Sequence, residues 1–181
     1  MQKYYPAHMD PTLKVTTRIV WFVLALPPLG TAAAHWYLAN RAAGDCSQTT
    51  PIAPAWIIAV ITLFMGAVAY FTRGLAPRGF ALNDIELVID RAIRPVRIAL
   101  HSITEVRRLD DAEMAGALRI IGASGFYGYY GWFWSGKLGK FRLYSGRFRD
   151  LVLLRSGKTV FVLGPEDTPE FTSDLRALLP H

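Results

Sequence analysis

Residues 122–136 read GASGFYGYYGWFWSG, an uncharged stretch in which five glycines alternate with seven aromatic side chains. A phosphate-binding loop would need its glycines between a strand and a helix, at a spacing such as G-x-G-x-x-G. A collagen-like repeat would need many more units, with proline. The spacing of three and the strand-like flanks fit neither pattern. The stretch therefore predicts an inter-strand loop that runs into part of a β-strand.

Two interpretations of these aromatic side chains remain open. In the first, they fold back over the sheet, and the glycines permit the tight bends that this requires. In the second, some of them face outward and rest on lipid or on a neighbouring membrane protein, because seven are more than one small barrel easily buries. The candidates for partner or membrane contact are Phe126, Tyr127, Tyr129, Tyr130, Trp132, Phe133 and Trp134.

Two long apolar runs lie in the first half of the chain, which has 181 residues, 52% of them hydrophobic, and a formal charge of +6. About 20 apolar helical residues cross a hydrocarbon core of roughly 30 Å. We therefore expect transmembrane helices at 19–39 and 53–72. Pro27 and Pro28 have no N–H to donate and predict a kink in the first helix. Its apolar length exceeds that of a signal-peptide core, so we expect the segment to be retained.

The basic residues near these helices predict their orientation. Cytoplasmic segments carry an excess of Lys and Arg, whereas the predicted outer loop at 40–52 holds little charge. We expect the tail at 1–18 and the C-terminal domain to face the cytoplasm. The lone Cys46 falls in the outer loop, so no disulfide framework is expected. The basic residues behind this prediction are Lys3, Lys14, Arg18, Arg73 and Arg78.

From residue 79 onward the hydrophobic period shortens to two, which predicts a β-domain at 79–181. Ser156 and Gly157 are placed to turn a hairpin between the last two strands. Thr168 and Pro169 predict the start of a C-terminal helix whose apolar stripe covers an open end of the sheet. The predicted strands are 80–82, 86–90, 94–100, 103–108, 117–121, 138–144, 148–155 and 159–163.

Three segments of this domain carry a resemblance to a known family: GFYGYYGWFW, LGKFRLYSGRFRDLVLLRSGKTVFVL and PEDTPEFTSDL. The sequence resembles the bacterial pleckstrin-homology-like (PH-like) domains that are anchored by N-terminal membrane helices. The resemblance implies an α+β membrane protein, with a two-helix transmembrane hairpin followed by an antiparallel β-barrel and a capping helix. It implies a fold and little about function, because such folds host many partners.

No catalytic or metal-binding pattern emerges from the sequence. The histidines His8, His35, His101 and His181 lack metal-ligand spacing with cysteine or carboxylates. The acidic group of Asp110, Asp111 and Glu113 predicts a solvated turn. We therefore expect a protein that is not an enzyme and has no metal.

A run of basic residues without an acid follows the aromatic stretch. Near a cytoplasmic leaflet such a run attracts anionic headgroups, and a solvated strand face is the competing interpretation. The first hairpin holds Asn83, Asp84 and Glu86, which argues against specific phosphoinositide binding, and we expect no nucleic-acid partner. The candidates for anionic-lipid contact are Lys137, Lys140, Arg142, Arg147 and Arg149.

Two further candidate sites lie towards the N-terminal end of the chain. Residues 31–35 read TAAAH and resemble the A-x-x-x-H motif of light-harvesting polypeptides, with Thr31 in place of the first alanine. His35 is therefore either an interfacial histidine or a ligand of a bacteriochlorophyll, and we expect no other cofactor. Tyr4 and Tyr5, in a tail without an evident fold, are predicted partner contacts.

The leading functional hypothesis is a non-catalytic docking subunit of a larger complex in the bacterial inner membrane. Its partners would be other integral membrane subunits, with lipids or pigments beside them. A bioenergetic complex, including a photosynthetic reaction centre with its antenna, is one candidate host. The alternative hypothesis is a membrane-tethered sensor that binds anionic lipid or a soluble regulatory protein.

Overall fold

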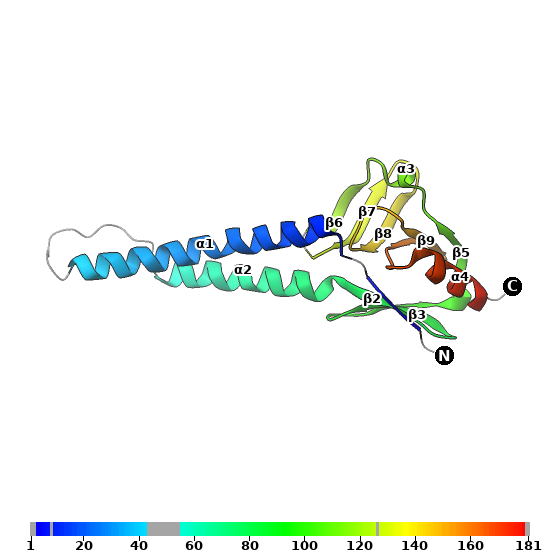
Figure 1. The fold of residues 1–181 in the computed structure, drawn as a ribbon, viewed down its shortest axis with the longest axis horizontal. Coiled ribbons are helices and arrows are strands. Elements are labelled where there is room, and N and C mark those ends of the chain that lie inside the picture. Colours follow the sequence, from blue (N-terminus) through cyan, green and yellow to red (C-terminus); the bar gives the residue numbers. More distant parts are fainter. Residues whose placement is uncertain (1–2, 8, 43–54, 126, 180–181) are drawn as a thin grey trace. The chain divides into compact units, whose positions relative to one another are not determined.

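A computed structural model describes residues 3–7, 9–42, 55–125 and 127–179. The predicted outer loop beyond residue 42, Cys46 and Phe126 lie outside the described residues. The chain divides into two compact units, one of residues 18–70 and one that joins 1–17 to 71–181. Figure 1 traces the order of the elements along the chain.

The unit of residues 18–70 is helical. Its helices belong to α1 (Pro11–Ala42) and α2 (Ala55–Leu75), both of which extend into the other unit. Segments Pro11–Ala34 and Trp56–Leu75 are long and apolar enough to cross a membrane, judged by length and composition. Most of their large apolar side chains are exposed.

The first helix continues through both of its prolines. Pro27 and Pro28 remove two backbone donors from the helix interior. The hydroxyl of Thr31 donates to the carbonyl oxygen of Pro27 at 2.8 Å and to that of Pro28 at 3.0 Å. At this level apolar side chains of α1 and α2, with Met65 and Gly66 among the α2 residues, line a cavity of about 380 Å³.

The described residues of the other unit form ten strands in two sheets. The four-stranded sheet has the order β1-β2-β3-β4 and is antiparallel throughout. Its strands are β1 (Lys3–Pro6), β2 (Pro77–Leu82), β3 (Glu86–Arg91) and β4 (Val96–Ala99). The six-stranded sheet has the order β5-β9-β10-β8-β7-β6. Its strands are β5 (Ile103–Arg108), β6 (Leu118–Ser124), β7 (Tyr129–Ser135), β8 (Gly139–Ser145), β9 (Val152–Ser156) and β10 (Thr159–Leu163).

The two sheets do not close into a barrel, which corrects the closed antiparallel barrel that the sequence predicted. The short 3-10 helix η1 (Leu100–Ser102) separates β4 from β5, and the described strands form two separate ladders. The β9–β10 hairpin also returns β10 to a place beside β8, where the two strands run parallel. Thr159 pairs with Ser156, so the hairpin loop is Gly157–Lys158, one residue later than predicted.

The central strands of the six-stranded sheet are buried on both faces, because their alternate residues belong to different cores. One core joins Val152, Leu154 and Leu163 to residues of the four-stranded sheet. The other joins Leu153, Val162 and Phe141 to the short helix α3 (Asp111–Met114). A sheet covered on both faces reads as continuous apolar runs, as LVLL and VFVL do here.

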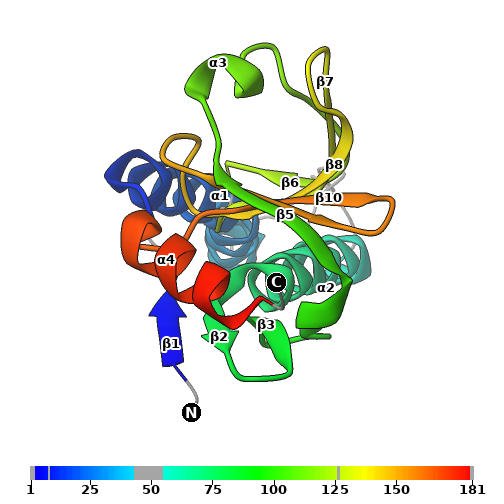
Figure 2. The same cartoon turned by 90° about the vertical axis from the view of Figure 1, so that its right-hand side faces the viewer.

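The C-terminal helix α4 (Thr168–Leu178) packs along β5, as Figure 2 shows. Phe171 and Leu175 of the predicted apolar stripe are fully buried in the first core, whereas Leu178 of the same stripe is exposed. The N-cap is Asp167, whose carboxylate accepts from the Glu170 N–H at 2.9 Å, and not Thr168. Thr168 is buried instead, and its hydroxyl donates to the Asp150 carbonyl oxygen at 2.9 Å.

Candidate docking surface

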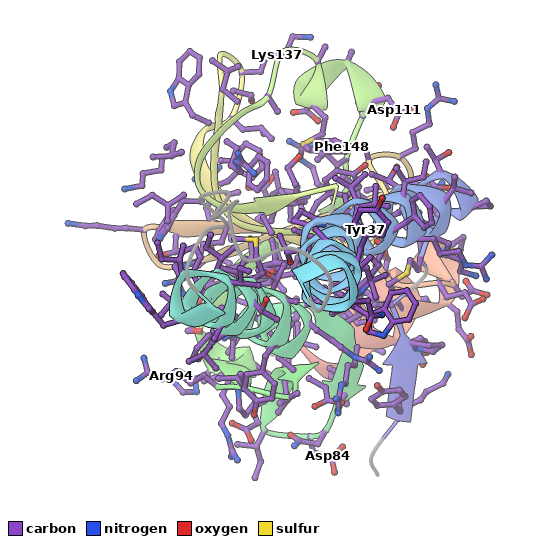
Figure 3. The ribbon with its side chains drawn as sticks, turned by 90° about the vertical axis from the view of Figure 1, so that its left-hand side faces the viewer. Tyr37, Asp84, Arg94, Asp111, Lys137 and Phe148 are labelled. Carbon is purple, nitrogen blue, oxygen red and sulfur yellow. The ribbon has the colours of Figure 1, made fainter. Side chains whose placement is uncertain are left out.

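The aromatic stretch forms the end of β6 and the whole of β7, and its side chains lie partly in the two cores and partly at the surface. Tyr130 belongs to the first core, and Phe133 belongs to the second. Tyr129 packs against the ring of Phe148, with the two ring centroids 4.2 Å apart. Phe148 is labelled in Figure 3. Part of the stretch is therefore buried in the cores, as the first interpretation expected, and part of it remains at the surface.

Two of its tyrosines hold the helical segments that belong to the same unit. The hydroxyl of Tyr130 donates to the carbonyl oxygen of Thr72, in the last turn of α2, at 2.6 Å. Burial raises the pKa of Tyr130 to about 12. The Tyr127 N–H donates to the Thr17 hydroxyl at 3.3 Å, and the Arg73 guanidinium lies 5.9 Å from the Tyr127 ring.

The glycine spacing has a structural cause at one pair of positions. Gly122 of β6 faces Gly131 of β7 in the ladder, and both have left-handed φ angles, of 136° and 121°. A Cβ on Gly131 would lie 2.2 Å from the carbonyl oxygen of Ile121, and one on Gly122 would lie 2.0 Å from that of Tyr130. The two backbones therefore approach more closely than any side chain allows.

The remaining aromatics form an ordered surface, which we call the tryptophan face. It consists of two cross-strand rows, each with an aliphatic residue of β6, a tryptophan of β7 and a base of β8. Paired residues share one side of a sheet, so each row lies on one face. The rows are Ile121–Trp132–Arg142 and Leu118–Trp134–Lys140.

The apolar members of this face are unusually open to solvent. Leu118 is 64% exposed, Ile121 is 69% exposed and Trp134 is 46% exposed. Ile120, at the bulge between the two rows, is also exposed. Exposed apolar side chains gathered in one place on a sheet are typical of an interaction surface.

The basic members stack on the central tryptophan. The Lys140 Nζ lies 4.5 Å from the centroid of the Trp132 ring, and the Arg142 guanidinium lies 4.7 Å from it. Nearby, the Arg91 guanidinium lies 5.4 Å from the Tyr144 ring, and its Nε is buried without a partner among the described residues. Burial, with the charge of Arg142, lowers the pKa of Arg91. Lys140 and Arg142 therefore give the face positive charge.

The other predicted lipid contacts do not join this face. Arg147 is largely buried in its own loop, where it donates to the Asp150 carboxylate at 2.9 Å and to the Pro165 carbonyl oxygen at 2.7 Å. Arg149 is exposed in that loop. Lys137 lies in the β7–β8 turn, at the opposite end of the view from Asp84 in the first hairpin (Figure 3).

The two N-terminal tyrosines lie in β1, which the sequence did not predict. Tyr5 is buried in the first core, where its ring meets that of Phe171 edge-on at 5.1 Å, so it faces this chain and not a partner. Burial and a hydrogen bond to Asp174 raise the pKa of Tyr5 to about 12. Tyr4 is exposed, with its hydroxyl 3.4 Å from the Asp90 carboxylate.

His35 and the acidic group at residues 110–113 are the remaining polar candidates from the sequence. The backbone of His35 lies in α1, and its side chain is outside the described ones. No group of three or more metal-ligating side chains occurs in the described parts of the chain. Glu113 completes a capping box with Asp110, and its carboxylate accepts from the Arg107 guanidinium at 2.7 Å, which lowers the pKa of Glu113.

The free edges of the six-stranded sheet differ. At β5, the Arg176 guanidinium of α4 donates to the Val106 carbonyl oxygen at 3.2 and 2.9 Å. At β6, every residue is exposed or half-exposed, and no other described strand pairs with its outer side. An uncovered edge strand presents a row of backbone donors and acceptors to another chain.

The family of this domain follows from comparison of its sequence with known protein families. A family model described as bacterial PH domain matches residues 78–179, more than half of the chain. The chain belongs to the bacterial PH domain family. No curated protein and no solved structure gives a significant match. The match runs from β2 to α4, so β1, α1 and α2 lie outside it.

Sequence reasoning missed Arg91 and Arg176. The stacking of Arg91 on Tyr144 joins two separate sheets, so no local pattern in the sequence indicates it. The hydrogen bonds of Arg176 to β5 could not be predicted from the sequence, because the position of this residue depends on how α4 packs. One signal was available for the tryptophan face: YYGWFWS is rich in aromatic residues, which favour strands.

Proposed function

We propose that this PH domain protein is a non-catalytic docking subunit of a larger assembly in the bacterial inner membrane. Its two apolar helices would span the bilayer, with both termini in the cytoplasm, and its PH domain would hold a partner subunit. The observation that supports this proposal is the tryptophan face, where exposed apolar side chains continue a buried sheet. Tryptophan and arginine are enriched where protein partners bind most tightly.

A role as an anionic-lipid sensor is the second candidate. The stacking of Lys140 and Arg142 on Trp132 favours it, because tryptophan and basic side chains also suit the headgroup region of a leaflet. Against it, Arg147 is engaged within its own loop. The predicted lipid-binding residues therefore offer fewer positively charged side chains to lipid than the sequence indicated.

The test is affinity purification of the tagged full-length protein from its native membranes in a mild detergent. Size-exclusion chromatography, mass spectrometry and an absorbance spectrum would follow. The docking function predicts stoichiometric integral membrane partners, and a pigmented peak would identify a photosynthetic host. A monomer or homo-oligomer without partners would contradict it.

The same preparation separates the two candidates. Hydrogen exchange is measured in nanodiscs with and without anionic lipid. If the domain is a sensor, anionic lipid should protect the β8 amides of the parent protein from exchange, and the double variant Lys140→Glu with Arg142→Glu should lose this protection. The docking function predicts no lipid-dependent protection in the parent protein.

A further inference from the structure

We propose that β6 binds an extended, acidic segment of the partner protein as an added strand of the six-stranded sheet. The inference rests on the proposed docking function and names its binding mode. Strand addition is a common way for an exposed sheet edge to bind a peptide: backbone hydrogen bonds supply affinity, and side-chain contacts supply specificity.

The first argument is the difference between the edges of this sheet. Proteins usually protect an edge strand by shortening it, charging it or covering it. β5 is covered by α4, and Arg176 uses one of its outward carbonyl groups. β6 has seven residues, LRIIGAS, with a single charge, and lacks a comparable cover among the described residues.

The second argument is the side-chain pattern beside that edge. The tryptophan face places Leu118 and Ile121 on β6 itself, with the tryptophans one strand further in. An added strand would therefore lay alternate side chains against this apolar surface. Burial of two largely exposed aliphatic side chains would favour association.

The third argument is charge, and it selects the kind of partner. Residues 115–149 contain six basic residues and no Asp or Glu. Arg119 lies on β6, where it pairs with Phe133 and so occupies the opposite face from the tryptophan face. Lys140 and Arg142 lie on the tryptophan face, two strands away, so an added strand would meet positive charge on both of its faces. Complementary charge favours an acidic segment. Two copies of β6 in an added pair would bring their basic residues together, which disfavours a second copy of this chain.

The bulge on β6 fits a specific role for this edge. The ladder with β7 skips Ile120, between Arg119 and Ile121. A bulge at an edge limits how far a flat strand can extend its pairing, and it re-aims the side chains beside it. An added segment therefore pairs over a short length, in a register that the bulge defines.

The experiment uses the full-length protein and its co-purifying partner. Arg119→Glu should weaken partner retention by roughly tenfold, the loss expected of a residue at the centre of a contact. Lys158→Glu is the matched control, because it makes the same charge change at the exposed β9–β10 turn of the same sheet. Its retention should equal that of the parent protein.

A second pair tests the apolar contact. Ile121→Ser should reduce retention, whereas Ile85→Ser, at an equally exposed isoleucine of the β2–β3 turn, should not. Thermal unfolding of each variant would confirm that the domain remains folded, and Arg119→Lys should restore retention.

Each possible outcome either supports strand addition at β6 or contradicts it. Selective loss in Arg119→Glu and Ile121→Ser supports strand addition. Equal retention in all variants overturns it and leaves the docking function standing. Dimers formed by the protein alone through residues 118–124 would overturn it in favour of a second copy. Absence of any partner would remove both proposals.

Discussion

The two edges of the six-stranded sheet show how one domain can treat equivalent positions in opposite ways. On β5, Ile103 and Val106 are buried, and Arg176 satisfies an outward carbonyl group. On β6, aliphatic side chains of similar size remain open to solvent. The covered edge contributes to the stability of the fold. The open edge buries less apolar surface, and its exposed apolar side chains support the binding role proposed above.

The largest effect is expected on the covered side. Phe171→Ala removes a fully buried ring of α4 and should lower the free energy of unfolding by about 3–5 kcal/mol. Ile121→Ala on β6 should stay within about 0.5 kcal/mol. Denaturant unfolding of the full-length protein in detergent measures both. Equal losses would show that the edges do not differ.

The next effect concerns the attachment of β6 itself. Gly131→Ala would force a side chain to a φ of 121° and against the Ile121 carbonyl oxygen, which should cost about 2 kcal/mol or more. Gly136→Ala is the control, because a Cβ there meets nothing within 4 Å. We expect increased hydrogen exchange in β6 and β7 for Gly131→Ala. Unchanged exchange would contradict the close approach of these strands.

A smaller loss is expected from uncovering the β5 edge. Arg176→Met removes both hydrogen bonds to the Val106 carbonyl oxygen and should destabilise the domain by about 1.5–3 kcal/mol. Arg119→Met on the open edge should have almost no effect. If the two arginine variants unfolded together, the cover over β5 would be of no energetic consequence.

The smallest effect comes from the aromatic stretch between the two edges. Tyr130→Phe removes the hydrogen bond to the Thr72 carbonyl oxygen, at a cost of about 1 kcal/mol. The pKa of Tyr130 is raised by burial to about 12, so its folded form holds the proton more tightly than the unfolded chain. The stability gained from this tighter proton binding is complete below the ordinary tyrosine pKa of about 10 and is lost as the pH rises towards 12.

Alkaline unfolding of the full-length protein tests this point. The parent should lose stability between roughly pH 10 and 12, and Tyr130→Phe should lose less, with the buried Tyr5 as the remaining contributor. Identical profiles would mean that Tyr130 is not buried.

Much of this fold was predictable from local sequence. Strong alternation and turn residues placed β2, β3 and β5 within a few residues of their observed ends, and Pro169 with the stripe at Phe171 and Leu175 predicted α4. The family resemblance extended these predictions to a PH-like domain, which the family match confirms.

Other features depend on contacts between distant segments and carry little local signal. β1 is a short strand that forms by pairing with β2, where Gly79 lets the chain approach closely. The parallel placement of β10 beside β8 also arises only from the order of strands in the sheet. The tryptophan face needed the register of three strands, because it combines residues from β6, β7 and β8.

The most direct test of the open edge is hydrogen exchange in residues 118–124 of the full-length protein, measured alone in nanodiscs and within its purified assembly. We predict that β6 amides become protected in the assembly, while protection of β5 at 103–108 stays the same. An intact assembly in which β6 exchanges as fast as in the isolated protein would contradict docking at this edge.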